Sequence, residues 1–389
     1  MFVQHSKRGT VKAKSIAGNS PDEIQAALTQ SMDDGFRPTL AMVFLSIKQD
    51  FLSVCEILQR HRIAIYGSTT NGEFTEAGIT TGSIAVLLLD LDPKSFMILF
   101  DEFAGSNYRE ATRAMAQKAR ARFALPAFFI AGSSLETDAE QLLRGFEDIL
   151  GKEVNVFGGM AGDDYGFTSQ FVFTNDRSST RGIVAVVLDE EKISIRGRAT
   201  CGWKPMGTEK TVTRSEGNRV YAVDGVPILD LMKKYSGIND LTPDNPNVVN
   251  EVSTMFALQL QREQGNPVMR PGIVIHWEDG SFSCGGSVPQ GSKVRFSLPP
   301  DFDVIDEVIQ GCEDLKRKEM PEADALIVFN CGGRFISLGP MISEEIEGIR
   351  KVWNVPMAGM FSSGEMARAT NGSLEFHNLT ACCVVLKER

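Results

Sequence analysis

Residues 63–73 read IAIYGSTTNGE, residues 154–164 read VNVFGGMAGDD, and residues 355–365 read VPMAGMFSSGE. Each stretch begins with a short apolar run, as expected for a buried strand, and passes into a turn with several glycines. An acidic residue follows the last glycine in every case. The three stretches therefore look like copies of one strand-and-turn element.

The segments that precede these turns repeat one order of elements. Continuous apolar runs predict buried strands, and amphipathic patterns predict the helices that follow them. The strands are expected at 39–47, 126–131 and 324–330, and the helices at 51–60, 136–150 and 343–352. Repetition at this scale is typical of an internally duplicated protein. The sequence thus predicts a mixed α/β (α+β) fold, with mixed β-sheets layered with helices and built from three related strand–helix–strand units.

A different pattern separates the second and third copies. Residues 207–217 are polar and charged without periodicity, and residues 278–280 give the turn signal of a hairpin. The chain of 389 residues is also too long for one compact core. We therefore expect two domains, residues 20–205 with two of the units and residues 218–389 with the third.

Composition argues against several classes of protein. Lys and Arg number 40 against 50 Asp and Glu, a net charge of −10, whereas nucleic-acid binding requires a basic surface. No apolar run approaches the roughly 18 residues of a transmembrane helix, and the N-terminus lacks the apolar segment of a signal peptide. We expect a cytoplasmic protein without nucleic-acid binding or membrane insertion.

Cysteine and histidine usage gives no sign of a metal or a redox centre. The seven cysteines include no CxxC pair, and the four histidines are scattered, so structural zinc is not expected. The sequence also lacks a P-loop and a GxGxxG fingerprint. We expect reduced thiols, no metal and no cofactor.

Several motifs resemble those of FIST proteins, a family named for F-box and intracellular signal transduction. Residues 65–73 resemble its GCSTAGE turn, residues 156–164 its FGGxAGDD turn, and residues 223–228 its VDGxPAxE element. Residues 329–334, 356–365 and 376–380 are similar to the family's SCxxR, PxxGFYSxGE and LHNxT segments. The resemblance covers residues 20–386 in the family's order.

The resemblance implies an N-terminal and a C-terminal FIST domain that sense small ligands in signal transduction, with amino acids or related carboxylates as suspected ligands. Because the FIST region fills this chain, a separate signalling output protein is the expected partner. The sequence departs from the family where Ser68 stands for the first Cys, Asn330 precedes Cys331 in place of Ser, and Phe376 replaces Leu.

Candidate ligand-binding residues lie in the glycine turns. Glycines at the carboxyl ends of strands let a ligand approach the backbone, and a carboxylate beside them could bind the ammonium group of an amino acid. The alternative is that the glycines are tight turns or close-packing points and that the acids cap the turns. The selected residues are Gly67, Gly72, Glu73, Gly158, Gly162, Asp163, Gly359, Gly364 and Glu365.

The C-terminal motifs add Cys331, Arg334, His377 and Asn378 to the predicted ligand site. The guanidinium of Arg334 suits a carboxylate, although an exposed loop arginine and a satisfied core histidine are the simpler interpretations. Cys331 and His377 could instead serve a thiol-dependent hydrolase or transferase. A third alternative is a scaffold that only docks partners. Since no complete catalytic constellation is readable, we expect a binding protein rather than an enzyme.

Overall fold

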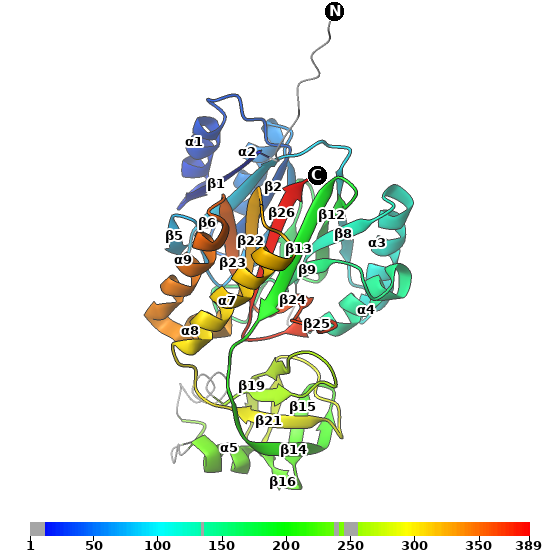
Figure 1. Cartoon of the computed structure of the whole chain (residues 1–389), viewed down its shortest axis with the longest axis vertical. Helices are drawn as coiled ribbons and strands as arrows, with labels where there is room; N and C mark the ends of the chain where they lie inside the picture. The colour runs from blue at the N-terminus through cyan, green and yellow to red at the C-terminus, as the bar shows by residue number, and fades with distance from the viewer. Residues whose placement is uncertain (1–11, 134–135, 237–240, 245–255) are drawn as a thin grey trace, which may run out of the picture.

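The computed structural model describes residues 12–133, 136–236, 241–244 and 256–389. It has two parts, which Figure 1 shows one above the other. Of the described residues, 12–133, 136–200 and 298–389 form a large layered part, which we call the body. Residues 205–236, 241–244 and 256–297 form a smaller β-rich part, which we call the barrel. The mixed α/β fold expected from the sequence is confirmed.

The first unit of the body is a four-stranded core sheet covered by two helices. Its strands follow the order β1-β6-β2-β3, in which β2 and β3 are parallel and the other pairs are antiparallel. Ser20 accepts a hydrogen bond from the Glu23 amide and Asp50 accepts one from the Ser53 amide, so both helices begin at capped ends. The elements are β1 (Lys12–Gly18), α1 (Pro21–Ser31), β2 (Leu40–Ser46), α2 (Phe51–Arg60), β3 (Ala64–Thr70) and β6 (Ile84–Asp90).

The other two units repeat this strand order, as β7-β12-β8-β9 and β13-β26-β22-β23. The second unit comprises β7 (Phe96–Glu102), α3 (Tyr108–Arg122), β8 (Pro126–Gly132), α4 (Ala139–Leu150), β9 (Val156–Met160) and β12 (Gly182–Asp189). The third comprises β13 (Ile193–Thr200), α7 (Asp303–Lys318), β22 (Ala325–Cys331), α8 (Gly332–Leu338), η1 (Gly339–Met341), α9 (Ile342–Trp353), β23 (Met357–Ser362) and β26 (Ala381–Glu388). The three related units predicted from the sequence are therefore present.

Each glycine turn leads into a short hairpin that completes the sheet of another unit. The hairpin β4 (Glu73–Thr75) and β5 (Gly78–Thr80) pairs with β23 of the third unit. The hairpin β10 (Val172–Phe173) and β11 (Ser178–Ser179) pairs with β3 of the first. The hairpin β24 (Glu365–Arg368) and β25 (Leu374–His377) pairs with β9 of the second. The exchange is cyclic, so each unit's sheet depends on a neighbour.

The inner faces of the three sheets meet in one apolar core. Phe44, Phe129 and Phe329 lie on the second strand of the first, second and third units, and all are buried. The Phe329 ring centroid is 6.1 Å from that of Phe44 and 6.4 Å from that of Phe129. Burial of each ring contributes about 1.5–3 kcal/mol. The helix pairs cover the outer faces, with α1 and α2, α3 and α4, and α7 and α9 on separate sides of the body (Figure 1).

The barrel is a sheet that closes on itself. Its strands follow the order β18-β17-β21-β14-β15-β20-β19, with β16 beside β15, and only Pro271 separates β18 from β19. One bent segment therefore forms both ends of the sheet. The elements are β14 (Pro205–Glu216), β15 (Arg219–Val223), β16 (Val226–Pro227), α5 (Ile228–Ser236), β17 (Leu258–Leu260), β18 (Val268–Arg270), β19 (Gly272–His276), β20 (Ser281–Cys284) and β21 (Lys293–Ser297).

The barrel interrupts the third unit in the sequence. It follows β13 and precedes α7, and β13 pairs along its length with β26 at the end of the chain. The sequence-based boundary at residues 205–218 divides the chain once. In space the barrel is an insertion, because the third unit continues after it from α7 to β26. Among the described residues, no helix has the length and apolar character needed to cross a membrane.

Candidate functional site

Arg334, predicted to hold a ligand carboxylate, lies fully buried on α8. Its Nε and Nη2 atoms donate to the Glu345 carboxylate at 2.9 and 2.6 Å. Nη1 donates to the carbonyl oxygens of Cys201 and Leu379, and Nη2 also donates to that of Val304. All three guanidinium nitrogens of Arg334 thus donate to groups of the protein. These hydrogen bonds link α8 to α7 and α9.

Glu365 and Glu73 are buried carboxyls with matching surroundings. Glu365 accepts hydrogen bonds from Ser362 Oγ at 2.7 Å and Thr380 Oγ1 at 2.8 Å. Glu73 accepts from Thr70 Oγ1 and, at 2.9 Å, from Ser83 Oγ. Burial raises the pKa of Glu365 to about 8 and that of Glu73 to about 7, against the opposing effect of these hydrogen bonds. In both units the carboxyl ties a glycine turn to the start of the unit's last strand.

Asp163 closes the second turn. Its carboxylate accepts from the amides of Phe167 at 2.9 Å, Thr168 at 2.6 Å and Ser169 at 3.0 Å. Burial opposes ionisation, but these hydrogen bonds outweigh it and lower the pKa of Asp163. The geometry is that of a turn cap, the alternative weighed for this residue.

The selected glycines are points of close approach, four of them between units and two, Gly158 and Gly364, within one unit. A Cβ at Gly67 would lie 2.2 Å from the ring of Phe173, and one at Gly359 would lie 2.3 Å from the ring of Phe74. These rings belong to the exchanged hairpins β10 and β4. The remaining selected glycines meet other groups at short range: Gly158 the carbonyl oxygen of Ile130, Gly162 the side chain of Asn71, Gly364 (φ +152°) the ring of Phe376, and Gly72 (φ +139°) the ring of Phe361.

His377 lies directly opposite Glu365 in the β24–β25 hairpin. It is buried, and its Nε2 lies 3.1 Å from the carbonyl oxygen of Ala367. Burial lowers its pKa to about 4, and the positive charge of Arg270 acts in the same direction. The imidazole is therefore neutral at physiological pH. Asn378 is also buried, and its Oδ1 has no hydrogen-bond partner among the described residues.

Cys331 is buried at the end of β22. Burial raises the pKa of its thiol, and the nearby Glu365 carboxyl acts in the same direction. No hydrogen bond joins Cys331 to His377 among the contacts of the described residues. The structure thus brings Glu365, His377, Gly364 and Gly158 together around β24, while Arg334, Glu73 and Asp163 occupy separate closed environments.

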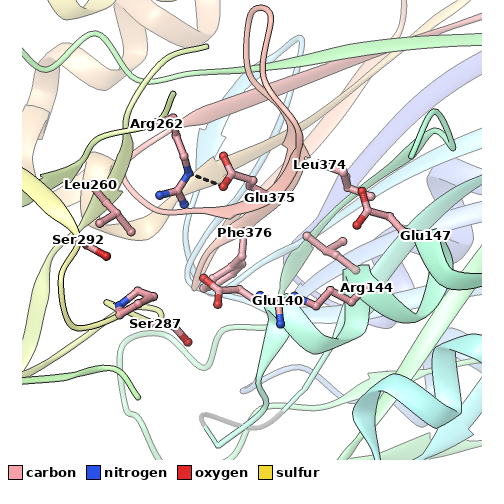
Figure 2. Close-up of a pocket in the computed structure, with 12 residues that line it drawn as sticks. Glu140, Arg144, Glu147, Leu260, Arg262, Ser287, Ser292, Leu374, Glu375 and Phe376 are labelled. Atoms are coloured by element: carbon pink, nitrogen blue, oxygen red, sulfur yellow. Dashed lines mark hydrogen bonds and ion pairs between the residues drawn. The ribbon is translucent and has the colours of Figure 1, made fainter. Parts of the chain in front are cut away.

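An open pocket lies elsewhere, at the junction between body and barrel (Figure 2). Its volume is about 180 Å³. The body contributes α4 and β25, and the barrel contributes β17 and the segments that flank β21. The residues that line the pocket are Glu140, Leu143, Arg144, Glu147, Leu260, Arg262, Ser287, Pro289, Ser292, Leu374, Glu375 and Phe376. None of the residues predicted from the glycine turns and C-terminal motifs is among them.

Two ion pairs cross the junction beside this pocket. Arg262 of the barrel donates from Nε to Glu375 of the body at 2.6 Å, as Figure 2 shows. Arg270 of the barrel is 1% exposed and donates from Nη2 to Glu140 of α4 at 2.6 Å. Arg270 also donates to the carbonyl oxygen of Phe376 at 3.1 Å. Basic groups of the barrel therefore face acidic groups of the body.

Several polar groups of the pocket have no partner among the described residues. Arg144 and Glu147, three positions apart on α4, form no hydrogen bond or ion pair there. Burial raises the pKa of Glu147. On the barrel side, the Nη atoms of Arg262 and the hydroxyls of Ser287 and Ser292 are likewise free. The pocket therefore offers hydrogen-bond donors from the barrel and a free carboxylate from the body.

This pocket could not be predicted from local sequence patterns. Its residues come from four segments that are far apart in the chain, and the barrel is what brings them together. The spacing of Glu140, Arg144 and Glu147 on one face of a helix was the one local signal. Charged residues at that spacing usually mark a solvated helix face.

Two family models together match most of the chain. Residues 39–226 match the FIST N domain and residues 229–368 match the FIST C domain. No curated protein matches the chain. The two matched segments span most of the body and the barrel, in the order expected from the motifs. This chain therefore belongs to the FIST family, whose domains are sensory domains of signal transduction.

Proposed function

We propose that this protein is a cytoplasmic sensor that binds a small ligand, an amino acid or a related carboxylate, in the pocket between body and barrel. The observation that carries the proposal is the pocket's position and lining. It lies where the body and the barrel meet, and side chains of both charges line it. Ligand sites occur preferentially at such domain junctions.

The size of the pocket supports a small metabolite. Its volume of about 180 Å³ lies below the roughly 300–1,000 Å³ of sites for drug-sized ligands. A free amino acid is of this scale.

In this proposal the residues selected from the motifs have a structural role and do not contact the ligand. Arg334, Glu365 and Glu73 are occupied by internal partners, and the glycines permit the exchange of hairpins. Glu365 lies on β24, which pairs with β25 in the sheet that α4 covers, and α4 and β25 carry the body's side of the pocket. The contribution of Glu365 to sensing is to hold that side in place.

We also propose that the protein acts by binding and not by catalysis. A thiol-dependent reaction would need a Cys331 thiolate, and burial raises the pKa of that thiol. A neutral His377 that already lies against the Ala367 carbonyl is a poor partner for it. The signal would pass to a separate output protein that responds to the relation between body and barrel.

A thermal-shift screen tests the proposed function. A ligand that binds only the folded state at 100 times its Kd stabilises it by about 2.7 kcal/mol, which a melting curve resolves. We expect a shift with one or a few amino acids or small carboxylates. The disruptive variant Arg144→Gln plus Glu147→Gln should abolish the shift. If no compound of a broad metabolite panel shifts the melting temperature, the sensor proposal fails.

A further inference from the structure

The free groups of the pocket differ between its two sides, and this difference bears on the ligand's chemistry. The barrel side presents donors, which are the Nη atoms of Arg262 and the hydroxyls of Ser287 and Ser292. The body side presents the carboxylate of Glu147 and the second oxygen of Glu140, whose first oxygen accepts from Arg270. Figure 2 shows Ser287, Ser292 and Arg262 on one side of the pocket and Glu140 and Glu147 on the other.

The walls between these groups are apolar. Leu260 comes from the barrel and Leu143, Leu374 and Phe376 from the body, and all four are buried. Burying apolar ligand surface against this wall contributes about 25 cal/mol of binding free energy for each Å² removed from water. A third charged group on the ligand would instead lose its hydration against these side chains.

We propose that the pocket takes an α-amino acid with an apolar side chain, whose carboxylate meets Arg262, Ser287 and Ser292 of the barrel and whose ammonium group meets Glu147 and Glu140 of the body. This inference rests on the proposed function and gives it a ligand class and an orientation. Two bidentate or charge-assisted contacts hold the ligand's ends, and the leucines and Phe376 contact its side chain. Arg144 is exposed on α4, three positions before Glu147, and is given no contact with the ligand.

This binding mode explains how occupancy would be sensed. A ligand held at one end by the barrel and at the other by the body adds contacts across the junction. The ion pairs Arg262–Glu375 and Arg270–Glu140 already join the two parts without ligand. The ligand would therefore add contacts to an existing junction and favour the arrangement in which body and barrel are joined, by as much as it prefers that arrangement.

Calorimetric titration of the whole chain with L-leucine and two analogues is the test. L-Leucinamide lacks the carboxylate, and 4-methylpentanoate lacks the ammonium group. We expect L-leucine to bind at least tenfold more tightly than either analogue, because each lost charge removes a charge-assisted hydrogen bond. Equal affinity for L-leucine and either analogue would overturn the inference.

Variants test which side chains contact the ligand's ammonium group and which contact its carboxylate. Glu147→Gln is nearly isosteric and breaks no internal contact, so the fold is retained; it should weaken L-leucine about tenfold or more and leave 4-methylpentanoate unchanged. Ser287→Ala plus Ser292→Ala should weaken 4-methylpentanoate and leave L-leucinamide unchanged. Glu110→Gln, an exposed acid on α3 with the same change of charge, is the control and should alter nothing.

The outcomes separate this inference from the proposed function. If other metabolites shift the melting temperature while L-leucine and further apolar amino acids do not bind, the sensor proposal stands and the ligand class is wrong. If L-leucine binds but Glu147→Gln has no effect, the orientation is wrong. Hydrogen exchange gives an independent readout, since bound ligand should slow exchange in β17, β18 and β25 together.

Discussion

Glu73 and Glu365 are equivalent residues of the first and third units. Each carboxyl accepts a hydrogen bond from a hydroxyl three positions earlier in the chain and another from a hydroxyl just before the unit's last strand. Buried carboxyls with raised pKa values bind protons more readily in the folded state than in the unfolded chain. Stability therefore falls as pH rises from the unfolded pKa of about 4.5 to the folded values of about 7 and 8.

This pH dependence gives the first prediction. Within that window each carboxyl should lower the free energy of unfolding by about 1.4 kcal/mol per pH unit. Glu365→Gln resembles the protonated acid and should flatten the profile between about pH 5 and 8, which urea denaturation between pH 5 and 9 would measure. A wild-type profile that rises over this range would contradict the assignment.

The second prediction concerns Arg334 and Glu345. Arg334→Met leaves the fully buried Glu345 carboxylate without its cation and should cost about 3–5 kcal/mol in chemical denaturation. Adding Glu345→Leu removes the stranded charge and should recover a large part of that loss. If Arg334→Met leaves stability unchanged and abolishes ligand binding instead, Arg334 is a ligand residue after all.

Exchange of hairpins between units gives the third prediction. Gly67→Ala drives a Cβ into the ring of Phe173 and should destabilise the protein by about 1–3 kcal/mol. In the double variant with Phe173→Leu the clash is relieved, so the two effects should be less than additive. Strict additivity, measured in a double-mutant cycle, would argue against the contact.

Reactivity of Cys331 gives the fourth prediction. The raised pKa of its buried thiol means that little thiolate exists near pH 7, so iodoacetamide should label Cys331 slowly in the native protein. Labelling should match that of free thiols only after denaturation, as peptide mapping by mass spectrometry would show. Rapid labelling with a midpoint well below pH 8.5 would restore the thiol-enzyme alternative.

Local patterns were sufficient for the elements and for their repetition. The runs at 39–47, 126–131 and 324–330 correspond to β2, β8 and β22, because a continuous apolar stretch favours a buried strand wherever it occurs. The pairing of β4 with β23 could not be predicted, since it joins residues almost 300 positions apart and nothing local specifies it. The closure of the barrel at Pro271 is non-local in the same sense.

The functional site could be predicted less well than the fold. Arg334 and Glu365 follow strand ends, where ligand contacts are common, but the partners that occupy them lie on other elements. For Arg334 these partners are Glu345 on α9 and Val304 on α7. A sequence pattern shows which groups reach the edge of a sheet, and the packing of distant helices decides whether that edge is open. Here the open surface is at the junction of body and barrel, between Arg262 and Glu147.

The cyclic exchange of hairpins has a consequence for how such a protein could evolve. A gene fragment that encoded one unit alone would yield a sheet with an unpaired edge at β3, β9 or β23, together with an orphan hairpin. Such products tend to aggregate or to assemble with copies of themselves. Recombination would therefore preserve the three units as a single inherited block, while an insertion between β13 and α7, such as the barrel, leaves the ring of exchanges intact.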